Sequence, residues 1–512
     1  MNLKNAIRAV AAAAVFAATC GMGLAIEPSN PNATSEARAL IELFHKISGK
    51  YVLTGQHNFP NARDRNTRFY AKEVGKTPAM WSSDFGFAED GDKDSYLARP
   101  DIVKEAIRQH KKGAVVNLCW HAVPPTADEP VTFQPIPGVE IAPDKLASVQ
   151  GRLTEEQYIE LMTPGTALRK KWEAQVDEIA EFLKQLQDAN VPVLWRPYHE
   201  MNGNWFWWGG RVGENGTADI YRMIYDRYVT HHKLNNLVWV WSVDRPSEPY
   251  RKYTNYYPGD DYLDILALDV YGSDFQQEYY DGLVALSNGK PLILGEVGTP
   301  PSPEVLDAQP KWASWIIWSG MVRANIAALK EMRNDPRLLS QEDPAFQEMM
   351  NPFRQACDLP PLPLEKRITV DFSGKWIRNE SESTTRDGAT MGEEPPFLMI
   401  VEQDDDVVFV KKYSMTEYGD DLISREEIHL DGSEMKSRMM NAERISTANL
   451  NEEERNLKIT SVVKFSFGGR DMEMKSSEEW SLKEGDDVLE VIQISSGFRG
   501  GENKSVFVFE KK

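Results

Sequence analysis

Residues 191–200, Val-Pro-Val-Leu-Trp-Arg-Pro-Tyr-His-Glu, are the part of the sequence most informative about its fold. It is a short, nearly continuous apolar run that ends in polar residues. Helical patterns flank it at residues 155–189, interrupted at Pro164-Gly165, and at residues 218–232. A strand that is apolar throughout is typical of a parallel sheet covered by helices on its faces. The stretch therefore predicts a parallel β-strand inside an α/β domain.

Similar runs recur along the first 320 residues, and together they predict eight strands. We expect them at residues 51–57, 78–85, 114–121, 191–200, 237–244, 265–272, 291–298 and 314–320, with helices such as 101–112 between them. Eight parallel strands, each followed by a crossover, are what a (β/α)8 (TIM) barrel requires. An open doubly wound sheet is the alternative, but no GxGxxG follows an early strand to support it.

The chain changes character near residue 360. The Pro-rich segment 359–364 cannot continue a helix, so we expect a linker between a barrel domain at 26–358 and a second domain at 365–512. Twelve of the 14 Trp residues precede the linker. The second part holds 32 acidic against 21 basic side chains and alternates apolar and polar residues in short runs, such as Phe397–Val401. This pattern predicts an antiparallel all-β domain, a barrel or a sandwich.

The N-terminus has the features of an export signal. A basic start is followed by a small-residue apolar region at 9–19, too short to cross a membrane, and by a small-x-Ala motif that ends at Ala25. Cleavage of residues 1–25 would make the protein secreted or periplasmic. Lipid attachment at Cys20 is the alternative, although the usual preceding Leu is missing. We expect Cys119 and Cys357 to be buried thiols.

Charge and hydropathy argue against a nucleic-acid partner and against a membrane-spanning segment. The net charge of −20 argues against nucleic acid, because phosphate binding needs a basic face. No other segment reaches 18 consecutive apolar residues, so we expect no membrane-spanning segment. The sequence does not predict the oligomeric state.

Two glutamates stand at the ends of expected strands: Glu200 on the fourth and Glu296 on the seventh. Active residues of such barrels project from the carboxyl ends of the strands, and these two strands lie across the barrel mouth from each other. Glycoside hydrolysis needs one carboxyl group to protonate the leaving oxygen and a second to attack or to activate water. A single strand-end Glu more often anchors a loop, but two of them in a Trp-rich chain indicate a glycosidase.

Two motifs carry a family resemblance. Residues 194–209, LWRPYHEMNGNWFWWG, resemble the acid/base strand of the glycoside hydrolase family 26 β-mannanases, and Gly295-Glu-Val-Gly298 matches their nucleophile motif G-E-x-G. The resemblance covers about residues 30–355. It implies that Glu200 is the general acid/base and Glu296 the nucleophile of a retaining, endo-acting hydrolase of β-1,4-mannosidic bonds. The substrate would be β-mannan or mannooligosaccharides, and neither metal nor organic cofactor is expected.

The same resemblance suggests roles for four aromatic residues. Trp205 is expected beside the cleaved bond, and Tyr271 near the nucleophile. His121 and Trp318 are expected to line the site of the −1 sugar. For Tyr271 the structural alternative is packing at the barrel mouth, and for Trp205 it is burial in the core.

Strand alternation adds further candidates. It places Arg196, Tyr198 and Glu200 on one side, which we take as the barrel interior. A guanidinium there would keep a nearby nucleophile ionised. His199, where related barrel glycosidases have Asn, could donate to a sugar hydroxyl or to a carboxyl oxygen.

Several alternatives stay open at this point. A β-1,3-xylanase or mixed-linkage glucanase of the same family would share the motifs. Exo action would require a loop that blocks the cleft, and the insertion at 124–151 is long enough to be that loop. A non-catalytic mannan-binding protein on the same barrel would be expected to lack one carboxylate, yet both are present. Phe372-Ser-Gly-Lys-Trp376 resembles the G-x-W opening of lipocalin-like barrels. The tail could hold a ligand, bind a glycan, or stabilise and space the barrel.

Overall fold

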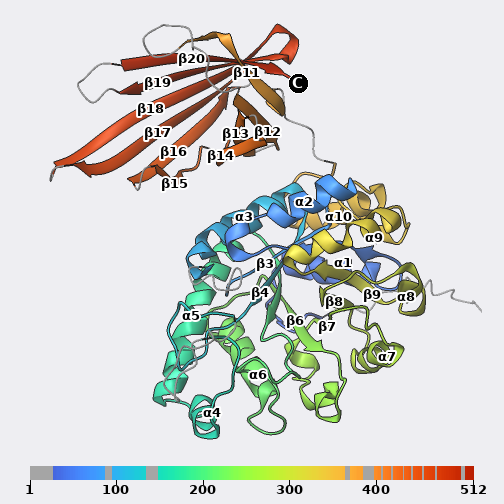
Figure 1. The fold of residues 1–512 in the computed structure, drawn as a ribbon. Helices are drawn as coiled ribbons and strands as arrows, with labels where there is room; N and C mark the ends of the chain where they lie inside the picture. The colour runs from blue at the N-terminus through green and yellow to red at the C-terminus, as the bar shows by residue number, and fades with distance from the viewer. Residues whose placement is uncertain are drawn as a thin grey trace, which may run out of the picture. The chain divides into compact units, whose positions relative to one another are not determined.

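The computed structural model describes residues 27–86, 95–133, 148–363, 370–384, 397–404, 407–416, 419–430, 432–439, 442–451, 455–467, 470–496 and 502–512. They form two compact units that divide between Leu364 and Glu365 (Figure 1). The expected signal peptide, residues 1–25 with Cys20, lies outside the described residues. No helix within them is long and apolar enough to span a membrane.

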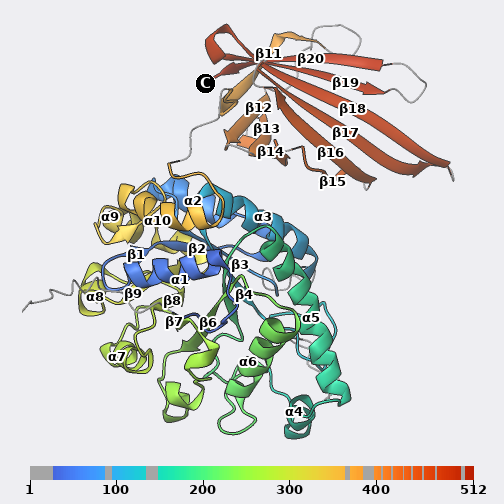
Figure 2. The same cartoon turned by 180° about the vertical axis from the view of Figure 1, so that it is seen from behind.

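The first unit is a closed barrel of parallel strands (Figures 1 and 2). All eight predicted strands occur, the first as two short pieces. They are β1 (Val52–Leu53) with β2 (Gly55–His57), β3 (Met80–Asp84), β4 (Val115–Trp120), β5 (Val193–Pro197), β6 (Leu237–Asp244), β7 (Ile265–Val270), β8 (Leu292–Val297) and β9 (Trp312–Ile317). Neighbours pair in parallel, and β9 closes the barrel by pairing with β1 and β2. The (β/α)8 barrel is confirmed, and β5 and β8 are its fourth and seventh strands. The short β10 (Leu338–Leu339) extends the sheet beside β1.

Helices surround this barrel where the periodicity predicts them. The predicted helix at 155–189 divides at Pro164-Gly165: Gly165 has φ +85°, and Thr166 caps the second helix by accepting from Arg169 N. The helices are α1 (Ser35–Ile47), α2 (Arg65–Val74), α3 (Arg99–Lys112), α4 (Glu155–Met162), α5 (Ala167–Asp188), α6 (Thr217–Asp226), α7 (Gln277–Leu286), α8 (Pro303–Ala308), α9 (Val322–Met332) and α10 (Pro344–Ala356).

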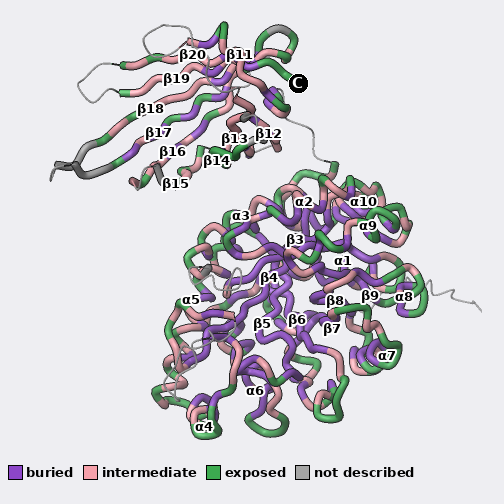
Figure 3. The backbone as a smooth tube through the Cα atoms, viewed as in Figure 1, coloured by how far each residue is buried: buried purple, intermediate pink, exposed green. Residues whose placement is uncertain are grey.

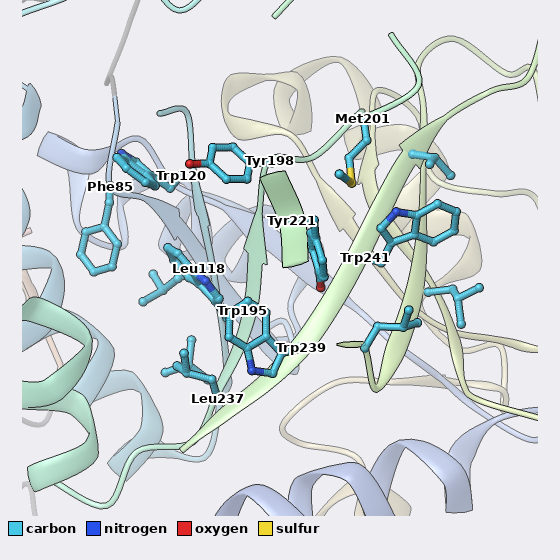
Figure 4. Packing of buried hydrophobic residues seen from close by; sticks show 14 of the residues in the cluster. Phe85, Leu118, Trp120, Trp195, Tyr198, Met201, Tyr221, Leu237, Trp239 and Trp241 are labelled. Carbon is cyan, nitrogen blue, oxygen red and sulfur yellow. The ribbon is translucent and has the colours of Figure 1, made fainter. Parts of the chain in front are cut away.

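Alternation along the strands separates two apolar layers. On β6, Trp239 and Trp241 belong to the cluster between the strands and the helices, part of which Figure 4 shows. Val238 and Val240 point the other way and pack in a cluster with α1 and α10. The strands are accordingly buried along their length, whereas exposed residues gather on the helices and loops (Figure 3). Cys119 and Cys357 are buried and are not bonded to each other.

The second unit is a single ten-stranded antiparallel sheet with a barrel-like form, which confirms the all-β prediction. Its strands are β11 (Gly374–Thr384), β12 (Phe397–Gln403), β13 (Val407–Thr416), β14 (Gly419–His429), β15 (Met435–Met439), β16 (Ala442–Asn451), β17 (Asn456–Phe467), β18 (Arg470–Lys483), β19 (Val488–Ser496) and β20 (Glu502–Lys511). Strands adjacent in the chain pair with each other except β14 and β15, and β11 also pairs with β20. Trp376 and Trp480 are buried in its own core, together with Phe372.

Candidate active site

The backbone turns sharply after β5, and this turn presents Glu200. The strand ends at Pro197, and Tyr198 and Glu200 both have φ +50°. The expectation that Tyr198 shares the interior side was wrong. Its hydroxyl accepts from Trp172 Nε1 of α5 at 2.7 Å, and its ring packs beside Trp120 outside the barrel (Figure 4). Alternation holds only while the chain is extended, so it cannot be continued past Pro197.

A bulge on β8 presents Glu296. The pairing of β7 with β8 shifts between Leu268↔Leu294 and Asp269↔Glu296, which leaves Gly295 as the extra residue. A β-bulge of this kind re-aims the side chain that follows it. A Cβ at Gly295 would lie 2.6 Å from Asp269 Oδ1, so the buried Asp269 carboxylate, which Arg196 holds in place, favours glycine here.

Arg196 lies beneath the two glutamates and bridges carboxylates from two other strands. Its Nη1 donates to Asp269 Oδ2 at 2.8 Å and to Ser242 Oγ at 3.1 Å, and its Nη2 donates to Glu296 Oε1. Burial opposes the charge of this guanidinium, but Asp269 and Glu296 raise its pKa, so it stays cationic. Arg196 therefore holds Glu296 in place from below.

Glu200 and Glu296 face each other in unlike surroundings. One carboxylate oxygen of each, with one of Asp269, lie within 4.8 Å of one another. Glu296 Oε2 accepts from the Tyr271 hydroxyl at 2.6 Å, whereas Glu200 Oε2 accepts from Trp205 Nε1 at 2.5 Å. Burial, and then the charges of Asp269 and Glu296, raise the pKa of Glu200 well above its usual value. Glu200 is thus suited to hold a proton beside a carboxylate that is bound to an arginine.

Both glutamates open into a cavity of about 640 Å³ at the carboxyl ends of the strands. It brings together all the predicted site residues except Arg196, which lies below: the two glutamates, His121, His199, Trp205, Tyr271 and Trp318. Trp205, Tyr271 and Trp318 are half-buried, and the two histidines are buried. The neighbouring Trp207 and Trp208 are buried, and their indoles donate to Ala122 O and His199 O, so both pack behind the wall.

The two histidines form a buried chain that starts at Asp84. Asp84 Oδ2 accepts from His121 Nδ1, and His121 Nε2 lies 3.0 Å from His199 Nε2. Burial disfavours charge on Asp84, but His121 and its hydrogen bond hold the pKa of Asp84 below its usual range. Burial lowers the pKa of His199. Because an ionised carboxylate can only accept, His121 donates to Asp84 from Nδ1. His199 Nε2 lies between His121 Nε2 and Glu296, 3.7 Å from Glu296 Oε1.

Sequence analysis did not assign several residues of the site. Asp84 and Asp269 stand at the carboxyl ends of strands, where active residues of such barrels gather, so their positions were the signal that could have found them. Arg251 gave no such signal, since it lies in the loop after β6. Its guanidinium lies over the Trp205 ring at 4.9 Å and pairs with Asp244 at 3.3 Å. The cavity is also lined by Phe59, Phe133, Gln150, Phe206, Arg245 and Met321.

Among the residues that the structure describes, two groups of side chains bring enough donor atoms together to hold a metal ion: Glu200 with Asp269 and Glu296, and His57 with Asp84 and Cys119. In the first group the Arg196 guanidinium already contacts Asp269 and Glu296. In the second, Asp84 accepts from the Cys119 thiol at 3.0 Å and from His121. Burial raises the pKa of Cys119, which keeps it a thiol. Hydrogen bonds and ion pairs within the protein thus account for both groups.

A (β/α)8 barrel whose carboxyl-end cavity presents two facing glutamates is the arrangement of a glycoside hydrolase. The model of glycosyl hydrolase family 26 matches residues 29–343, and the chain belongs to this family.

Named relatives and solved structures agree with this family assignment. The mannan endo-1,4-beta-mannosidase of Thermothelomyces thermophilus is 33% identical over 302 residues, which cover 57% of this chain and 56% of that protein. The chain spans about half the length of this relative and of two from Piromyces sp. Among solved structures, GH26A from Muricauda sp. MAR_2010_75 is 40% identical with a TM-score of 0.54, covering 61% of this chain and 98% of that one. The Podospora anserina GH26-CBM35 beta-(1,4)-mannanase is 29% identical with a TM-score of 0.52, covering 64% and 70%.

Proposed function

We propose that the protein hydrolyses β-1,4-mannosidic bonds with retention of anomeric configuration. The observation that carries the proposal is the placement of Glu200 and Glu296. Their nearest oxygens are within 4.8 Å, close to the separation of about 5–5.5 Å in retaining enzymes and short of the roughly 6.5–9.5 Å that an inverting water needs. The mannan endo-1,4-beta-mannosidases among the relatives support mannan as the substrate.

In the first step Glu296 attacks. A carboxylate oxygen of Glu296 forms a bond to C1 of the −1 sugar while the bond from C1 to the glycosidic oxygen breaks. The proton of Glu200 moves to that oxygen, so the leaving sugar departs as an alcohol. Burial and the charges of Asp269 and Glu296 raise the pKa of Glu200, which favours the protonated form that this step requires.

In the second step Glu200, now a carboxylate, takes a proton from water. The water oxygen bonds to C1, and the bond from C1 to Glu296 breaks, which restores both side chains. Arg196 and Tyr271 donate to Glu296 and stabilise its charge as it leaves. Trp205 N–H stabilises the carboxylate form of Glu200.

Replacing either glutamate tests this division of roles. Glu200→Ala and Glu296→Ala should each lower kcat on mannan by roughly three orders of magnitude or more. Glu200→Ala should retain activity on an aryl mannoside whose leaving group needs no proton, and azide should restore its second step. Equal, complete loss on both substrates would contradict the roles. NMR of the first product should show the β-anomer, and the α-anomer would exclude retention.

Product analysis separates the related activities. Reducing-end products should form from linear mannan and galactomannan faster than from lichenan or β-1,3-xylan. A preference for either of the last two would replace the mannanase proposal by the glucanase or xylanase alternative. Short and long products from the interior of the chain would show endo action.

We also propose that the protein is exported. The support is the N-terminal sequence: a basic start, a short apolar region and the small-x-Ala motif at Ala25. Mass spectrometry of the mature protein should find an N-terminus at Ile26. An acylated Cys20 would show a lipoprotein instead, and an intact Met1 with activity inside the cell would refute export.

A further inference from the structure

The second unit contains a cavity of its own. Its volume is about 200 Å³, and its lining comes from strands β11, β12, β13, β18, β19 and β20. Because this is less than the roughly 300–1,000 Å³ of drug-sized sites, the cavity suits a ligand of about one ring. Neither the barrel nor its two glutamates contributes to it.

The inner face of the sheet changes from apolar to charged along the strands. On β11 the core residue Trp376 is followed two positions later by Arg378, and on β13 Val410 is followed by Lys412. On β18 Glu478 stands two positions before the core residue Trp480. Since side chains two apart share a face, these charges point to the same side as the core and line the cavity beside it.

The inward-facing charges are balanced. Lys412 Nζ donates to Glu426 Oε1 at 2.9 Å, and Arg378 Nε donates to Glu380 Oε1 at 2.7 Å. Glu478 accepts from Trp480 Nε1 at 3.3 Å and from Gln493 Nε2 at 3.5 Å. Burial opposes the charge of Lys412, but Glu478 and Glu426 raise its pKa above the usual value. The cavity thus offers fixed donors and acceptors without a dominant sign.

Aromatic rings complete the wall. Phe397 and Phe507 both line the cavity, and the guanidinium of Arg378 lies over them at 5.1 Å and 6.0 Å from the ring centres. Such contacts hold the guanidinium in one orientation while leaving ring surface for apolar CH groups.

These features select one class of ligand. An aliphatic chain would bury the charged groups without hydrogen bonds, which is unfavourable. A cationic ligand would meet Arg378 and Lys412, and an anionic ligand would meet Glu478. A neutral polyol can donate to Glu478, accept from Arg378 and Lys412, and place CH groups on the phenylalanines. We propose that this cavity binds a single neutral sugar ring, at a site separate from the barrel cavity.

Binding to the full chain tests the proposal. Equilibrium dialysis would count the sites for mannose, glucose, galactose and xylose, with decanoate and acetate as apolar and anionic probes. Val491→Phe fills the cavity, and Ile492→Phe is its matched control because the next side chain points to the other face. Gln493→Leu removes a polar group of the cavity lining at similar side-chain size. It is the second test variant if Val491→Phe does not fold.

One of the sugars should occupy a site that survives in Ile492→Phe and weakens roughly tenfold or more in Val491→Phe and Gln493→Leu. Initial rates on soluble mannooligosaccharides should be the same in all variants, which separates this site from the barrel cavity. Equal sugar binding in all variants, the lack of any sugar site beyond the barrel cavity, or preference for decanoate or acetate would overturn the proposal.

Discussion

Replacing Trp205 by phenylalanine tests how the proton of Glu200 is controlled. The indole N–H donates to Glu200 Oε2 at 2.5 Å, and the ring lies half-buried on the cavity wall. This hydrogen bond favours the carboxylate form and lowers the pKa of Glu200, against the larger effects of burial and of the neighbouring carboxylates, which raise it. Phenylalanine keeps an aromatic face for the sugar but lacks the donor.

The magnitude follows from the strength of that bond. A hydrogen bond to a charged group contributes about 1.5–3 kcal/mol, and one pKa unit corresponds to about 1.4 kcal/mol. Loss of the bond should raise the pKa of Glu200 by about one to two units, and partial solvent access to the indole favours the lower figure. The acid form of Glu200 then persists to higher pH.

The assay is the pH dependence of kcat/KM, whose basic limb reports the acid of the unliganded enzyme. In Trp205→Phe this limb should move upward by about one unit. Trp318→Phe is the control: it removes an indole from the same cavity, but that ring stacks on His57 at 4.0 Å and does not bond to Glu200. Its basic limb should stay where it is in the unmodified protein.

Three results would contradict this account of Trp205. A basic limb that does not move in Trp205→Phe would show that the N–H does not control the proton of Glu200. A limb that moves downward would show that the indole stabilises the acid form, so the sign of its effect would be wrong. Equal shifts in Trp205→Phe and Trp318→Phe would point to a general change in solvation of the cavity.

Further predictions concern the same barrel and its boundary. Trp205→Ala should lower kcat/KM about tenfold to a hundredfold and leave Tm within a few degrees, because its ring faces the cavity; the reverse pattern would make it a core residue. Asp84→Asn should lower kcat/KM by about tenfold to a hundredfold, by analogy with carboxylates that orient metal-bound histidines. Unchanged kinetics would show that the hydrogen bond from His121 to Asp84 does not orient His121 for the reaction. Gly295→Ala should lower Tm and kcat together, since its Cβ would meet Asp269 Oδ1 at 2.6 Å. Ending the chain after Asp358 should leave kcat on mannooligosaccharides within about threefold, and collapse of kcat with an intact far-UV spectrum would show that the second unit supports the site.

Much of the barrel could be predicted because its strands are encoded locally. A buried parallel strand must be apolar over its whole length, and each of the eight runs found in this way coincides with a strand. Pro164-Gly165 likewise divides the helix at 155–189 because neither residue suits a helix interior. The alternating apolar and polar runs predicted the all-β second unit because this pattern, too, is encoded locally.

The positions of Glu200 and Glu296 at the mouth follow from the same local information, since both stand where a strand stops. Their directions do not. Continued alternation placed Tyr198 inside the barrel, whereas the turn after Pro197 sends it outward to Trp172. The bulge at Gly295 depends on the register between β7 and β8, which the sequence of β8 alone does not contain.

The class of each unit, the two carboxylates and the aromatic residues near them could be predicted from the sequence, because periodicity and strand ends depend on neighbouring residues. Tertiary structure decided what surrounds each carboxylate. Arg196 meets Asp269 and Glu296 across 73 and 100 residues of chain, and Asp84 meets His121 across 37. Tertiary structure likewise decided which charges meet in the interior of the second unit. The physical reason is that a buried charge is stable only beside its partner, and strand register, not spacing along the chain, brings the two together.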